Sequence, residues 1–398
     1  MHNKGFATLC AQDIAIENHH AHILPIYATS TFTYANLNEA QAFFRGEFDT
    51  YVYSRLGNPT VDAVADKVAK LEAFGSDFEA FGSLFASGMG AIASAILAVT
   101  KAGDTVITQG NLYGTTNELL TDFLRDYGIQ CEIVDLRDLD AIDNMMLNDE
   151  RIKLIYIETP ANPTLECYDL EGLANIAKAY NAYTIVDNTF ATPYLQRPLQ
   201  LGIDLVVHSS TKYLNGHGTG TSGVVVGRKD SGLKNSVYRI QKLIGAICSP
   251  IEAFLLNNGL KTLPLRMEQH QRNAAMLAEH LSENARVQSV NYLGLASHRS
   301  HLLSATQMNG AGGMLSFDIN GSQADALQFL RNLKTCVLTA SLGTADTLIS
   351  HPATMSHVKV PPEQRHAYGI TDTLIRVSVG LEDIDDIASD ITQALENR

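Results

Sequence analysis

The feature that most constrains the fold is an alternation, from residue 61 to about residue 230, of short apolar runs and longer stretches with apolar residues at helical spacing. This alternation is typical of βαβ units around a mostly parallel sheet. The candidate strands are DTVITQ (104–109), QCEIVD (130–135), KLIYIE (153–158), YTIVD (183–187), DLVVH (204–208) and GVVVG (223–227). Most are apolar throughout, as expected when helices cover both faces of the sheet. We therefore predict an α/β domain.

The pattern changes after Pro250. A long helical pattern over residues 251–284 is followed by short strand-like segments at 313–319 and 374–380. The first forty or so residues have little periodicity, and such an arm usually needs another surface to order it. We predict an N-terminal arm (1–45), an α/β domain that binds a cofactor (46–250) and a smaller α+β domain (251–398).

Charge and apolar patterning exclude several classes of function. The net charge of −14 and the pI near 5.3 argue against general binding to nucleic acid or to an anionic membrane. No apolar run is long enough to span a bilayer, and the N-terminus has no signal-peptide pattern. We expect a cytoplasmic enzyme.

Cysteine and histidine spacing gives no sign of a disulfide framework or a metal site. The five cysteines are widely spread without a CxxC pair, which fits reduced thiols (Cys10, Cys131, Cys167, Cys248 and Cys336). His19, His20 and His22 do not share a helix face and have no carboxylate or cysteine at ligand spacing. We expect no metal.

Polar residues gather where the candidate strands end. Ligands of open α/β sheets bind at the carboxyl ends of the strands, so these positions are the informative ones. Three successive strands lead into such residues, which one crevice can collect: Glu158 and Asn162, then Asp187, then His208, Ser209, Thr211 and Lys212.

Each of these residues has a plainer interpretation when taken alone. Asp187 can be a turn residue or a helix N-cap, and Lys212 a solvated loop lysine. The segment ASGMGAIASAILA (86–98) joins a glycine-containing turn to a helix, so its start is either a tight helix N-terminus or an anion site. It lacks the GxxxxGK[ST] pattern, which argues against nucleotide triphosphate hydrolysis.

The combination is more specific because it meets the needs of one cofactor, pyridoxal 5'-phosphate (PLP). PLP needs a lysine for its aldehyde, a carboxylate for its pyridine nitrogen, an anion cradle for its phosphate and usually an aromatic face. The candidates for these roles are, in order, Lys212, Asp187, the turn Ser87, Gly88 and Met89 with Ser209 and Thr211, and Tyr113.

With these motifs in place, the sequence resembles the Cys/Met-metabolism family of PLP-dependent enzymes over nearly its whole length. The family includes cystathionine γ-synthase, cystathionine γ- and β-lyases, methionine γ-lyase and the acylhomoserine sulfhydrylases. The segments that carry the resemblance follow family order: YSRLGNPT (53–60), ASGMGAI (86–92), LYGTT (112–116), YIETPANPT (156–164), VDNTFATP (186–193), HSSTKYLNGHG (208–218), GLKTLPLRM (259–267), SLGTADTLISHPATMSH (341–357) and LIRVSVGLEDIDDI (374–387).

The resemblance implies a fold like that of the aspartate aminotransferases and a homotetramer built from two catalytic dimers. It implies that Tyr53 and Arg55 reach into the neighbouring subunit to hold its cofactor phosphate. Asn162 is expected near the phenolic oxygen of the cofactor. Arg376 is expected to grip the substrate carboxylate, with Ser341 near it.

The resemblance leaves two reactions open. One is a carbon–sulfur γ-lyase reaction on cystathionine or methionine, which we favour, with Lys212, Tyr113 and Asp187 as catalytic residues. The other is γ-replacement on O-acetyl- or O-succinylhomoserine, the reaction of a cystathionine γ-synthase or a homoserine sulfhydrylase. Thr115 stands where methionine γ-lyases typically carry cysteine, and Thr219 after GHG resembles the sulfhydrylases. A catalytically silent relative is disfavoured because every position named carries a chemically competent residue.

Overall fold

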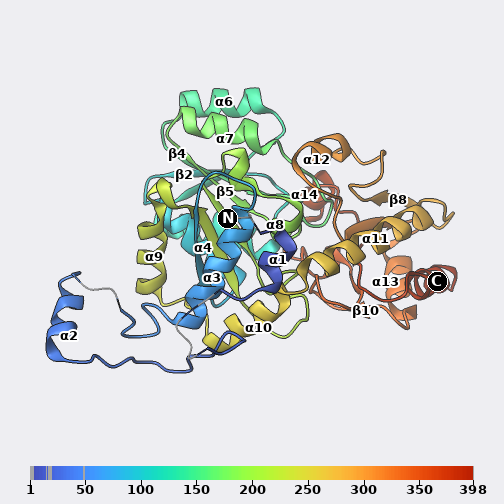
Figure 1. The fold of residues 1–398 in the computed structure, drawn as a ribbon. Helices are drawn as coiled ribbons and strands as arrows, with labels where there is room; N and C mark the ends of the chain where they lie inside the picture. The colour runs from blue at the N-terminus through green and yellow to red at the C-terminus, as the bar shows by residue number, and fades with distance from the viewer. Residues whose placement is uncertain (1–3, 15, 17–19, 48–49, 398) are drawn as a thin grey trace.

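The larger of two β-sheets has seven strands and runs through the centre of the molecule (Figure 1). The structure is a computed structural model that describes residues 4–14, 16, 20–47 and 50–397. The sheet order is β1-β7-β6-β5-β4-β2-β3, and only β7 runs against its neighbours. Its strands are β1 (Ala80–Phe85), β2 (Thr105–Thr108), β3 (Gln130–Ile133), β4 (Ile152–Glu158), β5 (Tyr183–Asp187), β6 (Leu205–His208) and β7 (Gly223–Arg228).

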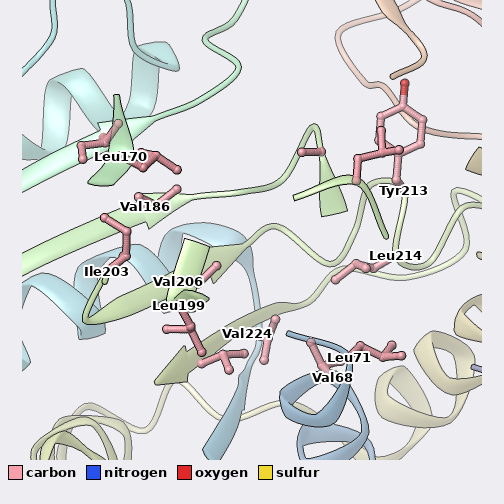
Figure 2. Close-up of a cluster of buried hydrophobic side chains, with 14 of the residues drawn as sticks. Val68, Leu71, Leu170, Val186, Leu199, Ile203, Val206, Tyr213, Leu214 and Val224 are labelled. Carbon is pink, nitrogen blue, oxygen red and sulfur yellow. The ribbon is translucent and has the colours of Figure 1, made fainter. Parts of the chain in front are cut away.

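Helices cover both faces of this sheet, as the apolar strands predict. Successive residues of one strand enter different cores: Val186 faces α3 (Pro59–Glu72) and α7 (Leu170–Ala179), whereas Ile185 faces α4 (Gly88–Val99) and α9 (Leu233–Ile244). Figure 2 shows the first of these cores, where Val68 and Leu71 of α3 lie below Val206 and Val224 of the sheet. The strand ends are therefore held by packing on both sides.

The second sheet has five strands in the order β10-β11-β12-β9-β8. They are β8 (Val287–Asn291), β9 (Met314–Ile319), β10 (Val337–Leu338), β11 (Leu348–Ser350) and β12 (Leu374–Ser378). Three helices pack on one face around a separate core, namely α11 (Leu263–Ser282), α13 (Gln323–Asn332) and α15 (Ile384–Glu396). The remaining helices are α1 (Phe6–Ala11), α2 (Leu37–Phe44), α5 (Gly114–Glu118), α6 (Leu139–Asn148), α8 (Thr192–Leu195), α10 (Pro250–Leu260), α12 (His301–Gln307) and α14 (Pro362–Ala367).

The six strands predicted in the first sheet are confirmed to within one or two residues at their ends. The strand β1 (AFGSLF) escaped prediction because Gly82 and Ser83 interrupt its apolar pattern. The long pattern over 251–284 divides into α10 and α11, and Pro264 lies in the first turn of α11, where its missing N–H costs nothing. Residues 115–128 have apolar side chains at helical spacing, but they form α5, a π-helical turn and a 3₁₀ turn in place of one helix.

The N-terminal segment contains two helices with different environments, α1, which packs against the larger unit, and α2, which does not. Helix α1 packs against α3 and α11 and buries Cys10 completely. Asp13 then accepts hydrogen bonds from Leu24 N, Asn257 Nδ2 and Lys261 Nζ, which fix this part to the larger unit. Helix α2 instead buries none of its residues and extends away from the rest of the described chain (Figure 1). Within the described part of the chain, no helix combines the length and the apolar character needed to cross a bilayer.

Candidate active site

A cavity of about 250 Å³ lies at the carboxyl ends of β4, β5 and β6, where the second sheet approaches the first. The strand-end rule predicted this position. Eleven of the residues predicted from the sequence line it: Ser87, Gly88, Met89, Tyr113, Glu158, Asn162, Asp187, Ser209, Thr211, Lys212 and Arg376. Residues that are far apart in the sequence therefore form one site.

One end of the cavity is the N-terminus of α4. Ser87 is its N-cap, and the Ser87 hydroxyl accepts a hydrogen bond from Gly90 N at 3.0 Å. Gly88 lies close to Ser209, the residue that follows β6. A Cβ at Gly88 would stand 2.7 Å from Ser209 Cβ. The absence of a side chain at Gly88 thus lets backbone N–H groups and the Ser209 hydroxyl meet at one point. Such a helix start favours an anion.

Asp187 forms the buried floor of the cavity. Thr189 N donates to Asp187 Oδ1 at 3.0 Å, and Thr189 Oγ1 accepts from Ser209 N at 2.8 Å, so Thr189 connects two strand ends. Burial raises the pKa of Asp187, while the hydrogen bonds from Thr189 and the charge of His208 act in the opposite direction. A cationic ring nitrogen beside Asp187 would stabilise its charged form.

Lys212 reaches the cavity from the loop after β6. Lys212 Nζ donates to Ser341 Oγ at 3.2 Å. Burial, and then the charge of Arg376, lower the pKa of Lys212. A lysine whose pKa is lowered in this way spends more time as the free amine, which is the form that attacks an aldehyde or accepts a proton.

Arg376 enters the cavity from the second sheet because β12 alternates. Ile375 and Val377 point into the second core, so Arg376 between them points to the other side. Its Nη1 donates to Asn162 Oδ1 at 3.1 Å and its Nη2 to the Ser341 carbonyl at 2.9 Å. Burial lowers the pKa of Arg376 to about 10, so it stays charged at neutral pH.

Three predicted residues, Tyr53, Arg55 and His208, do not line the cavity of this chain. His208 is instead buried in the core, where its Nε2 lies 2.6 Å from Glu72 Oε1. Tyr53 is 42% exposed. Arg55 Nη1 donates to the Lys242 carbonyl at the end of α9, at 2.9 Å. Ser341 is not among the lining residues either, but it contacts both Lys212 and Arg376.

The glycine-rich stretch after Lys212 has a structural task. Gly216 has a φ of +72°, and a Cβ there would stand 2.0 Å from Arg266 Nη1. This space admits the buried Arg266 guanidinium, which donates to the Tyr213 and Gly259 carbonyls. Thr219 Oγ1 donates to Asn215 Oδ1 at 3.2 Å within the same turn and does not line the cavity.

The sequence reasoning missed several lining residues. Among them, Thr189 and Phe190 lie two and three residues after Asp187, so the strand-end rule could have predicted them. Others come from loops that only the fold brings near, namely Thr221, Ala340, Leu342 and Ser356. A second hollow of about 620 Å³ shares Tyr113, Ala340 and Ser356 with the cavity, and Thr115 lines it. The site thus continues into a larger space.

The residues present fit PLP. The start of α4 and the Ser209 hydroxyl match a phosphate, Asp187 a protonated pyridine nitrogen, Lys212 an aldehyde, and the half-exposed Tyr113 ring a flat aromatic ring. The close approach at Gly88 is the observation that supports this most directly. In the described ranges no cluster of three or more histidine, cysteine or acidic side chains is arranged for a metal, and His19 lies outside those ranges.

Comparisons with known proteins agree with this geometry. Residues 8–396 match the family described as Cys/Met metabolism PLP-dependent enzyme. The L-methionine γ-lyase of Fusobacterium nucleatum subsp. nucleatum is 42% identical over 374 residues, 94% of this chain and 93% of that protein. The crystal structure of cystathionine γ-lyase from Lactobacillus plantarum with L-serine has a TM-score of 0.90 at 36% identity, covering 99% of both chains. A cystathionine γ-synthase structure from Xanthomonas oryzae pv. oryzae, with aminoacrylate and cysteine, has a TM-score of 0.90 at 35% identity, covering 99% of this chain and 98% of that one.

Proposed function

Because the chain belongs to the Cys/Met-metabolism family of PLP-dependent enzymes, we propose that it is a carbon–sulfur γ-lyase of sulfur amino-acid metabolism. Its substrate in this proposal is cystathionine or methionine, and its products are an oxo acid, ammonia and a thiol. The observation that carries the proposal is the placement of Lys212, Asp187 and Arg376 around one buried cavity. The names of the methionine γ-lyase and cystathionine γ-lyase relatives support the choice of reaction.

Bound PLP supplies an electron sink that stabilises negative charge at the α carbon of the substrate. Lys212 would hold the cofactor, and its free amine would accept and return protons at the α and β carbons of the substrate. The lowered pKa of Lys212 suits this task because the free amine can accept a proton near neutral pH. Asp187 keeps a proton on the ring nitrogen.

Arg376 binds the substrate carboxylate. A guanidinium and a carboxylate pair through two parallel hydrogen bonds, which fixes the orientation of the substrate. Asn162 and Ser341 hold the guanidinium in place, and Ser341 also contacts Lys212. The bond to be broken is therefore set relative to the cofactor ring by residues of the second sheet.

Tyr113 stands where the cavity meets the second hollow. Its ring covers the cofactor, and its hydroxyl assists proton transfer to the leaving group at the γ carbon. The part of the substrate beyond the sulfur then lies in the hollow.

Each site is completed by a second copy of the chain in this proposal. Tyr53 and Arg55 serve the cofactor phosphate of the neighbouring subunit, within a homotetramer made of two catalytic dimers. Neither residue lines the cavity of its own chain, and Tyr53 is exposed, which supports this arrangement. The five cysteines form no disulfide, which supports a cytoplasmic location.

The test is product identification. The purified enzyme is incubated with cystathionine, methionine, O-acetylhomoserine and O-succinylhomoserine, each with and without sulfide or cysteine. A γ-lyase forms an oxo acid and ammonia from the sulfur amino acids without an added thiol. Products that are new thiols or thioethers, formed only when a thiol or sulfide is added, would instead establish the γ-replacement reaction.

A further inference from the structure

Glu158 is a buried carboxyl group of the cavity that the proposed function does not use. It is the last residue of β4, lines the cavity and is only 6% exposed. Its backbone is fixed by Gln109, whose Nε2 donates to the Glu158 carbonyl at 2.7 Å and whose Oε1 accepts from Glu158 N at 3.3 Å. A carboxyl group is rarely buried without a partner, so its contacts indicate its task.

The two carboxyl oxygens of Glu158 bind two different loops. Oε2 accepts a hydrogen bond from Tyr113 N at 2.9 Å, in the loop after β2. Oε1 accepts one from Asn162 N at 3.0 Å, in the loop after β4. Both donors are main-chain N–H groups, so Glu158 fixes the backbone from which each side chain enters the cavity.

The Asn162 branch extends to the second sheet. The side chain of Asn162 accepts from Arg376 Nη1 at 3.1 Å. A chain of hydrogen bonds thus runs from Glu158 through Asn162 to the guanidinium that the proposed function assigns to the substrate carboxylate. The Tyr113 branch ends at the aromatic ring assigned to the cofactor.

The position of Glu158 has an electrostatic cost. Glu158 is in register with Asp187 on the neighbouring strand, so two carboxyl groups lie side by side in the interior. Burial, and then the charge of Asp187, raise the pKa of Glu158, and the two backbone hydrogen bonds act in the opposite direction. Tyr156 interacts electrostatically with both carboxyl groups and Tyr168 with that of Glu158, and Arg376 lies at the end of the Asn162 branch. An apolar residue would avoid this cost but would leave two N–H donors unpaired.

We propose that Glu158 is a positioning residue, which holds the Tyr113 ring against the cofactor and, through Asn162, the Arg376 guanidinium against the substrate carboxylate. The proposal rests on the roles given to Tyr113 and Arg376 above. It adds a determinant of cofactor orientation and substrate affinity that acts through other residues.

The test compares Glu158→Gln with a matched control, Asp204→Asn. Asp204 is a partly buried carboxylate directly before β6, where it accepts from Thr184 N at 2.8 Å and from Thr184 Oγ1 at 3.0 Å. It does not line the cavity, and burial raises its pKa as well. Both changes replace one carboxylate oxygen by an NH₂ group, so they disturb the fold in similar ways.

Four quantities are measured on each holoenzyme: the visible circular dichroism of the bound cofactor, kcat, KM and Tm. In Glu158→Gln we expect an altered dichroism band, because the ring environment changes. We also expect a fall in kcat/KM of about 10- to 100-fold with a clear rise in KM, because the NH₂ group of glutamine cannot accept the hydrogen bond from one of the two loops. The control should change only Tm. Glu158→Asp, which is too short to reach both loops, should give the same pattern as Glu158→Gln if that variant does not fold.

Unchanged dichroism and KM in a folded Glu158 variant would overturn the proposal, as would losses that Asp204→Asn reproduces. The dichroism is recorded without substrate, so it tests the positioning role even if the enzyme catalyses γ-replacement. An error in the proposed reaction would change the products formed and leave the dichroism result as it is.

Discussion

Two regions of the molecule to which we assign PLP-binding residues are built in different ways. The strand ends from Glu158 to Lys212 lie between packed cores and make their hydrogen bonds within the chain. The segment with Tyr53 and Arg55 lies on the surface, and Arg55 donates a hydrogen bond to the Lys242 carbonyl at the end of α9. In the proposed function, the interior region is built by packing and hydrogen bonds within one chain, whereas the surface region contributes to a site only after two chains have assembled.

The largest effect is expected in the interior region, from Lys212→Ala. Without the amine, the cofactor has no covalent attachment and the substrate has no proton acceptor. We expect kcat to fall by about 10³-fold or more, together with loss of the yellow colour that attached PLP gives. Steady-state kinetics and an absorption spectrum check both. Turnover at the normal rate would remove Lys212 from the mechanism.

Asp187→Asn is the next strongest test of the interior region. The amide keeps the shape of the side chain but cannot hold a proton on the ring nitrogen by charge. We expect kcat to fall by about 10²-fold or more, with Tm close to that of the unchanged protein. A variant with full activity would show that Asp187 has only a structural role beside Thr189.

Arg55→Ala tests the surface region. Loss of one charged contact to the phosphate should raise the dissociation constant of PLP by about 10- to 100-fold, as measured by cofactor titration of the apoenzyme. If Arg55 serves the neighbouring site, Arg55→Ala and Lys212→Ala subunits should recover activity when they are mixed and reassembled, because some sites then combine intact halves. No recovery in hybrids shown to have formed would place Arg55 outside the site.

Thr219→Ala should have the smallest effect. Thr219 Oγ1 makes one hydrogen bond to Asn215 within the turn and does not line the cavity. We expect a change in stability of about 0.5 kcal/mol or less, with product ratios unchanged. A shift from oxo acid to thioether products in this variant would instead make Thr219 a determinant of the reaction.

The sequence predicted most of the interior region because a simple rule applies there. Ligand-binding residues follow the carboxyl ends of parallel strands, and apolar runs mark those strands. The rule identified Asp187 and Lys212 but not Ala340, Leu342 or Ser356, whose loops approach only after the second sheet has packed against the first. The sequence shows Glu158 as the end of a strand. Its two hydrogen bonds, from Tyr113 N and Asn162 N, depend on the conformations of two loops, which no local sequence pattern predicts.

In the proposed function, Lys212 carries the cofactor in the cavity between the two sheets. Reduction of the holoenzyme with sodium borohydride makes the bond between lysine and PLP permanent, and mass spectrometry of the digested protein then locates it. We expect the pyridoxyl phosphate group to be found on the peptide that contains Lys212, at close to one group per chain. The group on another lysine, or no modified peptide from a yellow protein, would contradict it.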